Sequence, residues 1–456
     1  MLPATAEKAG SKAGEDLVAT DMGRIGADGG AARPLTGRQG VVLATLTFIY
    51  VLNFLDRQLL GILAKPIQDT LHITDGQLGL IGGLYFAMFY CFIAIPVGWL
   101  ADRTNRVGVL SLACAVWSAA TIACGLAATY GQLVAARMTV GFGEAGGVPP
   151  SYAIITDTFP PEQRGFAFGI YNLGPPIGAA IGIAFGAAIA AAFDWRHAFG
   201  AIGVVGIAAA ALTRLLVREP VRGGTDATAD PTAGLPAPFW ATVTDFFGDR
   251  VLLLTALAGG ATQFVTYGVG NFAVLFLIRE KGMTLAQIAV WYALVVAIGM
   301  SASMLASGRV IDRMTRRSRA AYATAPAASL AVAAPFYLGF VWAPSWPLAL
   351  LLLLVVMFFN YFYLPASVAL VQEEVRPNRR VLAGALLLLV MNFVGLGLGP
   401  TYVGWASDAL TARGHAHSLQ LALYSLTPVY LVAILLYVAL ARRLRAGQSP
   451  AERSVA

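Results

Sequence analysis

The sequence predicts an all-α membrane protein with twelve transmembrane helices, and three observations carry that prediction. The chain of 456 residues is 58% hydrophobic and only 12% charged, whereas soluble domains carry about 25% charged residues. Its apolar runs reach the roughly 20 residues that a helix needs to cross a hydrocarbon core. Runs such as 41–62 and 346–370 lack the strict alternation of a barrel strand, so helices must satisfy the backbone.

The twelve expected spans are bounded by charged residues, proline or glycine. They are 41–64, 78–101, 107–128, 132–158, 165–192 and 197–217, then 250–278, 285–310, 320–342, 346–371, 381–407 and 419–441. They predict two six-helix bundles, at 39–217 and 250–442. The polar, proline-containing stretch 218–249 predicts a cytoplasmic linker. Residues 1–38 lack an apolar signal core and predict a disordered cytoplasmic tail, and 443–456 predict a second tail.

Positive charge alternates between the two sides of the expected spans. One set of loops holds Arg103, Arg164, Arg319 and Arg380 among others, whereas the opposite loops are poor in arginine and lysine. The positive-inside rule places the basic set in the cytoplasm, with both termini and the linker. We therefore expect an integral plasma-membrane protein. Many arginines and few lysines favour a bacterial host with GC-rich DNA, and hence the bacterial inner membrane.

The two halves repeat one another at fixed places. A glycine, an aspartate and two arginines close the second span and recur with identical spacing after the eighth. The first set is Gly98, Asp102, Arg103 and Arg106, and the second is Gly308, Asp312, Arg313 and Arg316. Parallel repeats of six helices are one architecture of secondary transporters. We interpret all of these residues except Arg316 as a cytoplasmic gate whose charges pair across the bundles in one conformation. Charge that only sets topology is the alternative.

Motifs in the first half resemble those of a known family. The stretch from Gly98 to Arg106 resembles the loop signature of the major facilitator superfamily, and its repetition strengthens the likeness. Arg137-x-x-x-Gly141-x-Gly143-Glu144 resembles that superfamily's second motif. The resemblance implies the major facilitator fold, with two parallel six-helix bundles, and a transport function by alternating access.

Two further likenesses are narrower. Asn53-Phe-Leu-Asp56-Arg57, together with Gly143-Glu144-Ala145-Gly146, resembles the spinster-like branch, known for lysolipid and sphingolipid export. Gly169-x-x-x-x-Gly174-Pro175-x-x-Gly178 resembles the superfamily's antiporter motif, with one extra residue after Gly169. We interpret Gly174, Pro175 and Gly178 as a helix-kink motif that hinges or seals the cavity; mere kinking is the alternative.

Three charges lie deep inside apolar spans. Asp56 and Arg57 interrupt the first span, and Glu144 lies near the middle of the fourth. Placing a charge at a helix centre costs about 2.5–3.5 kcal/mol on insertion scales, so such residues are functional candidates. Burial disfavours an unpaired carboxylate's charged form, so it can carry a proton. We interpret Glu144, with Asp56, as the proton-coupling site, Arg57 as the anchor for an anionic head group, and Arg137 as a supporting charge.

The resemblance lends Asp56, Arg57 and Glu144 the same roles, and a structural ion pair is the alternative reading. The second half is chemically different, because Asp56 and Arg57 align with Val274 and Leu275, and Glu144 aligns with Asn360. Polar and aromatic residues there predict further substrate contacts, for which packing is the competing explanation. They are Asn271, Asn360 and Tyr361. An arginine anchor beside aromatic side chains suits an amphipathic substrate such as a lysophospholipid or sphingolipid.

Other classes of function find little support in the sequence. The four histidines lie at loops or span ends, and no metal-ligand spacing, phosphate loop or nucleophile elbow occurs. We therefore expect no enzyme, no metal and no cofactor besides protons as the coupling ion. We also expect a monomer in the bilayer without a nucleic-acid partner. A proton-driven multidrug or small-metabolite exporter and a non-transporting receptor or sensor remain alternatives. Substrate identity and symport versus antiport stay open.

Overall fold

The computed structural model describes residues 36–221, 239–376 and 379–446, with the backbone alone at Asp102, Pro161, Glu162 and Val381. These residues are almost entirely helical, and no strand lies among them. Residues from Val41 onwards pack as one compact unit. Most of the two expected tails, 1–38 and 443–456, lies outside the described residues.

The helices before the linker form what we call the N-terminal half. Three of its six expected spans, 78–101, 132–158 and 165–192, consist of two helical pieces in sequence. The helices are α2 (Gly37–Ile62), α3 (Ala64–Leu71), α4 (Asp75–Gly82), α5 (Leu84–Arg103), α6 (Arg106–Leu126), α7 (Tyr130–Glu144), α8 (Val148–Thr158), α9 (Pro161–Tyr171), α10 (Gly174–Ala192) and α11 (Trp195–Leu216).

The C-terminal half follows α12 (Phe239–Gly248) and includes two π-helical segments, η1 and η3. Its elements are α13 (Arg250–Arg279), α14 (Leu285–Gln287), η1 (Ile288–Tyr292), α15 (Ala293–Thr315), α16 (Ala321–Trp342), α17 (Trp346–Asn360), α18 (Tyr363–Glu374), α19 (Arg380–Asn392), η3 (Phe393–Leu398), α20 (Gly399–Ala412), α21 (Ser418–Tyr424) and α22 (Thr427–Ala446).

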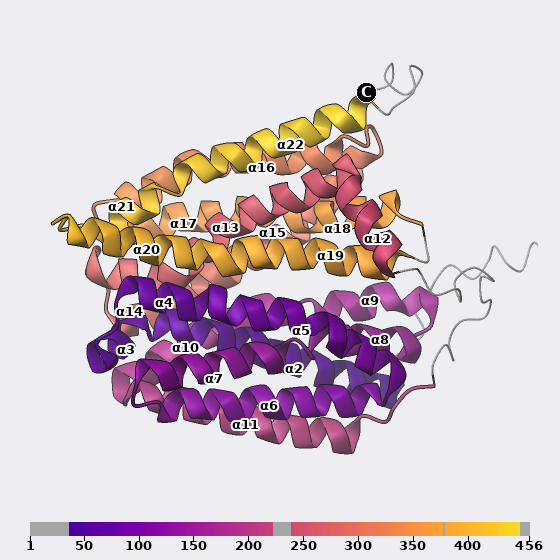
Figure 1. The fold of residues 1–456 in the computed structure, drawn as a ribbon, viewed down its shortest axis with the longest axis horizontal. Coiled ribbons are helices and arrows are strands. Elements are labelled where there is room, and N and C mark those ends of the chain that lie inside the picture. Colours follow the sequence, from indigo (N-terminus) through magenta and orange to yellow (C-terminus); the bar gives the residue numbers. More distant parts are fainter. Residues whose placement is uncertain (1–35, 222–238, 377–378, 447–456) are drawn as a thin grey trace, which may run out of the picture. The chain divides into compact units, whose positions relative to one another are not determined.

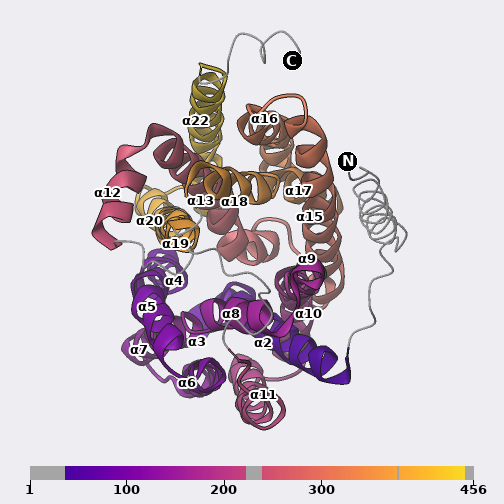
Figure 2. The ribbon, with the colours of Figure 1, turned by 90° about the vertical axis from the view of Figure 1, so that its right-hand side faces the viewer.

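The predicted fold class is confirmed. Among the described residues, eleven helical stretches are long and apolar enough to cross a membrane. The remaining expected span, the fourth (132–158), is divided into α7 and α8 by a turn at residues 145–147, so neither piece reaches the required length. Figure 2 looks along the helices from one end and shows the two halves as two groups of helices.

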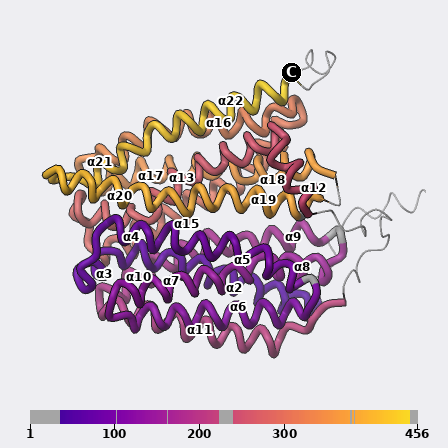
Figure 3. The backbone as a smooth tube through the Cα atoms, in the orientation of Figure 1, coloured from indigo at the N-terminus to yellow at the C-terminus, as the bar shows by residue number. Residues whose placement is uncertain are grey.

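Helix breaks recur at matching places in the two halves, as the sequence repeat predicts. Glu144 is the last residue of α7, and its aligned partner Asn360 is the last residue of α17. Gly174-Pro175 opens α10, and Gly399-Pro400 opens α20. Proline is favourable in the first turn, where its missing N–H has no helical acceptor. Figure 3 follows the chain back and forth through these broken spans.

The halves meet along two pairs of spans. Helix α4 packs against α20, with α5 against η3, while α10 packs against α14, η1 and α15. Figure 1 shows α3, α4, α14 and α21 at one end of this unit, on the left. We call this the outer end, after the expectation from loop charge that its loops lie away from the cytoplasm.

The linker region contains a short helix outside the expected spans. Helix α12, inside the predicted linker 218–249, packs against α13 and α19. It buries Thr242 and Phe246 while Trp240 is exposed. This amphipathic helix of ten residues is too short to cross a bilayer. A long apolar run in the sequence therefore does not mark it.

Candidate functional site

The central feature of the N-terminal half is an ion pair between α2 and α7. Arg57 Nε donates to Glu144 Oε2 at 2.6 Å. The Glu144 side chain is 0% exposed and that of Arg57 only 10%. A charge-assisted hydrogen bond of this length is among the stronger polar contacts in a protein interior. The sequence-predicted anchor and proton site are thus direct partners.

A second ion pair joins the same two helices. Arg137 Nη1 lies 3.7 Å from Asp56 Oδ1, and both side chains are buried. The other oxygen of Asp56, Oδ2, accepts a hydrogen bond from Thr121 Oγ1 of α6 at 2.7 Å. Adjacent helical residues point about 100° apart, so Asp56 and Arg57 each take a separate basic or acidic partner on α7.

Aromatic rings enclose the two guanidinium groups. The Arg57 Cζ atom lies 4.4 Å from the centre of the Tyr90 ring and 5.0 Å from that of Phe54. Phe86 lies between the two arginines, 5.4 Å from Arg57 and 5.3 Å from Arg137. Tyr267 of the C-terminal half also lies beside Arg57. Ring faces attract cations, so these rings stabilise the Arg57 guanidinium without neutralising its charge. Phe86 does the same for Arg137.

Several charged atoms of this cluster lack a hydrogen bond among the described residues. They are Glu144 Oε1, Asp56 Oδ1, and Nε and Nη1 of Arg137. Buried polar atoms are nearly always paired in proteins, so each unpaired atom needs an explanation. Two carboxylates and two guanidiniums with spare donors and acceptors can change partners, and a carboxylate can take up a proton.

Glycines bring the supporting helices close to this cluster. A Cβ atom at Gly178 of α10 would lie 2.3 Å from the Val51 carbonyl oxygen of α2, and one at Gly174 would lie 2.9 Å from the Tyr50 ring. On α7, a Cβ at Gly141 would lie 2.7 Å from the carbonyl oxygen of Phe86. Small residues of this kind permit close helix packing inside membranes. The helix is interrupted just before Gly174-Pro175, where the kink was expected.

The predicted contacts in the C-terminal half lie in different surroundings. Asn360 is buried and exchanges two hydrogen bonds with the Tyr430 hydroxyl, at 3.0 and 3.1 Å. Asn271 is half-buried where the halves meet, with its side-chain oxygen against Gly82. Tyr361 is half-buried at the break after α17. Asn360 is therefore engaged within its own half in this conformation, and the binding roles of all three remain predictions.

The described contacts of Arg103 and Arg106, two residues of the expected cytoplasmic gate, lie within the N-terminal half. Arg103 lies over Trp99 of its own helix at 4.1 Å. Arg106 forms an ion pair with Asp157 of α8. Asp312 and Arg313 line a shallow hollow of about 520 Å³ with Arg309 and Arg316. The Asp102 side chain lies outside the described residues. Gly98 approaches Pro149, and Gly308 has open space around it.

Sequence reasoning missed some residues that complete the cluster. Thr121, Phe86 and Tyr90 look like ordinary residues of membrane helices, and only the packing of α5 and α6 brings them to the charges. No group of metal ligands occurs among the described residues.

Comparisons with known proteins identify the family. The sequence model of the Major Facilitator Superfamily matches residues 46–400. A relative from Mycolicibacterium smegmatis, described as an MFS-type efflux pump, is 30% identical over 393 residues, covering 85% of this chain and 88% of that protein. Human protein spinster homolog 1 is 29% identical over 248 residues, covering 54% of this chain and 47% of that protein. The alignment thus spans about half of the spinster relative.

A solved structure agrees with the sequence comparisons. It is a bacterial homolog of the human lysosomal transporter Spinster, in an inward-facing and unoccupied conformation. Its TM-score is 0.83 at 29% identity, covering 91% of this chain and 100% of that chain. The fold and family are those of integral membrane transporters. The chain belongs to the major facilitator superfamily, in its spinster-like group.

Proposed function

We propose that this transporter is a proton-coupled secondary active transporter that moves an anionic amphipathic substrate by alternating access. The observation that carries the proposal is the buried pair of Arg57 with Glu144, beside Asp56 and Arg137. Four ionisable groups in the interior of a membrane protein are costly, and they are retained for coupling or binding in many transporters.

Proton uptake by Glu144 and substrate binding by Arg57 are coupled, because both break the same ion pair. When Glu144 takes up a proton, it loses its charge and with it the ion pair to Arg57. The buried guanidinium is then left without a counter-ion, which is strongly unfavourable. An anionic head group restores the balance by replacing the carboxylate. Asp56 and Arg137 form the second pair, through which the same exchange can pass.

The surroundings of Arg57 support an amphipathic substrate. Its guanidinium can bind an anionic head group such as a phosphate bidentately. The rings of Tyr90, Phe54 and Phe86 around it offer apolar contact for the rest of the molecule. We propose a lysophospholipid or sphingolipid, in line with the likeness to spinster homologues. The proposal includes protons as the coupling ion and no other cofactor.

The proposed setting is the bacterial inner membrane, with both termini in the cytoplasm. The alternation of basic and non-basic loops supports this orientation. We propose a monomer whose partners are the bilayer and its amphipathic substrate, without nucleic acid.

Flux into proteoliposomes with an imposed pH gradient tests the proposal. Labelled lysophospholipid should move with wild-type protein, and dissipating the gradient should abolish accumulation. Glu144→Gln should lose the response to the gradient, and Arg57→Ala should lose binding of the anionic lipid in a thermal-shift assay. Arg442→Ala, at an exposed site near the end of α22, is the control. Gradient-driven flux by Glu144→Gln at the wild-type rate would exclude the proton site.

A drug or small-metabolite exporter is the second candidate, favoured by the likeness to the mycobacterial efflux pump over most of both chains. It predicts flux of cationic drugs that survives Arg57→Ala, whereas the lipid proposal predicts anion preference that this substitution removes. A receptor or sensor with this fold would give no flux of either compound.

A further inference from the structure

Several hydrogen bonds between described residues of the two halves lie at the outer end, with one carboxylate, that of Asp75, at their centre. Asp75 is the first residue of α4, directly after the N-cap Thr74. Thr74 and Gln77 cap each other reciprocally, through Thr74 Oγ1 and Gln77 Oε1. This capping box fixes the start of α4 and therefore the position of the Asp75 carboxylate.

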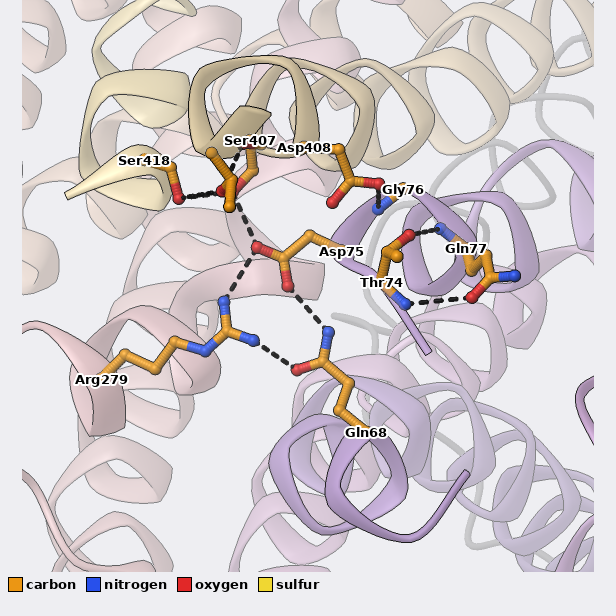
Figure 4. A network of polar contacts seen from close by, with 10 residues as sticks. Gln68, Thr74, Asp75, Gly76, Gln77, Arg279, Ser407, Asp408 and Ser418 are labelled. Atoms are coloured by element: carbon orange, nitrogen blue, oxygen red, sulfur yellow. Dashed lines mark hydrogen bonds and ion pairs between the residues drawn. The ribbon is translucent and has the colours of Figure 1, made fainter. Parts of the chain in front are cut away.

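Three donors converge on Asp75, two of them from the opposite half. Arg279 Nη1, at the end of α13, donates to Oδ2 at 2.8 Å, and Ser407 Oγ of α20 donates to the same oxygen at 2.7 Å. Gln68 Nε2 of α3 donates to Oδ1 at 2.7 Å. Arg279 Nη2 in turn donates to Gln68 Oε1 at 2.7 Å, which closes a ring of three side chains (Figure 4).

A second carboxylate crosses the seam in the opposite direction. Asp408 of α20 accepts a hydrogen bond from the backbone N–H of Gly76 at 2.9 Å. This N–H lies in the first turn of α4, where it has no acceptor within its own helix. A negative charge is also favourable at a helix N-terminus. Figure 4 shows both carboxylates on the same side of the start of α4.

Glycines allow the two helices to meet closely beneath these contacts. A Cβ at Gly79 would lie 2.4 Å from the Pro400 carbonyl oxygen, and one at Gly404 would lie 2.3 Å from that of Asp75. Leu84 N donates to Thr401 Oγ1 at 3.1 Å, at the start of α5. The close approach removes the Asp75 side chain from solvent, and Asp75 is only 6% exposed.

We infer that Asp75, Arg279, Gln68, Ser407 and Asp408 form an outer latch, which holds the halves together at this end and must open once in each transport cycle. The inference deepens the proposed function and rests on its alternating access. A polar seam suits a contact that opens repeatedly, because a carboxylate and a guanidinium recover hydration when they separate. The Arg279 side chain is already 31% exposed, so water can enter the seam from this residue.

At the other end, the described contacts of two matching charges lie within the N-terminal half. Arg103 lies over Trp99 of its own helix, and Arg106 pairs with Asp157 within the N-terminal half. The solved relative with a TM-score of 0.83 is inward-facing. A closed outer latch is the arrangement that an inward-facing conformation requires.

Spin-label distances across the outer end test the latch. Labels at Asp69→Cys and Arg413→Cys, two exposed sites on opposite halves, report whether this end is closed or open. Wild-type protein in lipid should give mainly the short distance. Asp75→Asn and Arg279→Gln should each raise the ratio of long to short distances roughly tenfold or more, and the double variant should add little because both remove one contact. Ser407→Ala should give a smaller shift in the same direction.

Glu280→Gln is the matched control, because Glu280 pairs with His417 at the same end but within the C-terminal half. An unchanged distance distribution in Asp75→Asn and Ser407→Ala, or an equal shift in Glu280→Gln, overturns the inference. The measurement needs neither a pH gradient nor a substrate. A failed latch therefore leaves the Glu144 and Arg57 flux results intact, and failed flux leaves the latch result intact.

Discussion

The two buried ion pairs differ in how strongly each holds its partners. Arg57 and Glu144 share a direct hydrogen bond at 2.6 Å, whereas Arg137 Nη1 lies 3.7 Å from Asp56 Oδ1. Asp56 gains its hydrogen bond from Thr121 instead. Removing one member of a buried pair leaves an uncompensated charge, which costs about 3–5 kcal/mol. Neutralising both members avoids that cost.

A double-mutant cycle on Asp56 and Arg137 should therefore be strongly non-additive. Asp56→Asn alone leaves Arg137 charged and poorly paired, and we expect it to lower the free energy of unfolding by about 3–5 kcal/mol. Adding Arg137→Gln should recover part of this loss. Thermal melting in detergent micelles of the two single variants and the double variant measures the coupling. Additive losses would show that the two charges do not interact.

Thr121 should contribute to stability through its bond to Asp56. Thr121→Val keeps the shape of the side chain and removes a donor to a buried carboxylate, at an expected cost of about 1–3 kcal/mol. Thr139→Val is the control, since Thr139 is exposed and bonds only to Ala135 of its own helix. An equal fall of the melting temperature in both variants would contradict a specific role of the Thr121–Asp56 hydrogen bond, since the loss of any hydroxyl would then have the same effect.

At this scale, the sequence reveals charges more readily than their partners. Asp56, Arg57 and Glu144 stand out because an ionisable group in an apolar run is costly wherever it points. Thr121 and Tyr90 carry no such signal, since threonine and tyrosine are common in membrane helices. Pairing depends on how α2, α5, α6 and α7 pack, which residue type alone does not encode.

Among the helices, α10 positions α2 through a stripe of glycines. A Cβ at Gly178 would lie 2.3 Å from the Val51 carbonyl oxygen and 2.9 Å from Phe54 Cβ, and one at Gly182 would lie 2.9 Å from the Leu55 carbonyl oxygen. Backbone atoms cannot rotate away as a side chain can. The segment of α2 that carries Asp56 and Arg57 therefore lies directly against this stripe.

Gly178→Ala should consequently destabilise the protein, although alanine is the better helix former. Overpacking of this kind costs about 1–3 kcal/mol. Gly169→Ala is the matched control, because no atom lies within 4 Å of the added Cβ, and there we expect a gain of up to about 1 kcal/mol. Thermal melting of the two variants in the same detergent compares them. Equal melting temperatures would contradict close packing at Gly178.

Helices were predictable from the sequence to the extent that each is long and apolar. The turn after Glu144 divides the fourth expected span, and the π-helical segments η1 and η3 lie inside the eighth and eleventh. Average hydropathy does not reveal such interruptions of a helix, because the residues on both sides remain apolar. The repeat was more informative, since it aligned Glu144 with Asn360, and both end a helix.

Across the described part of the molecule, the buried charged side chains fall into two groups, a central cluster in the N-terminal half and a polar seam at the outer end. The sequence pointed to the first but not to the second. Asp75 and Arg279 lie near predicted span ends, where charge is cheap, and 204 residues separate them. The two residues come into contact only because the two halves associate.

A disulfide across the seam should stop transport without preventing binding from the inner side. A Cβ at Gly76 would lie 2.5 Å from Asp408 Oδ2, so Gly76→Cys combined with Asp408→Cys places two thiols within bonding reach. The three native cysteines are buried and should not interfere. Oxidation should abolish flux in proteoliposomes, and a reductant should restore it.

Each single-cysteine variant should keep its flux under oxidation, which separates cross-linking from damage to the seam. The oxidised double variant should still bind substrate added from the inner side, because the bond constrains only the end that is already closed. We therefore expect the oxidised double variant to retain substrate binding and to lose flux, because it cannot release substrate to the opposite side. Full flux by the cross-linked protein would mean that the outer end never opens, and alternating access would have to be abandoned.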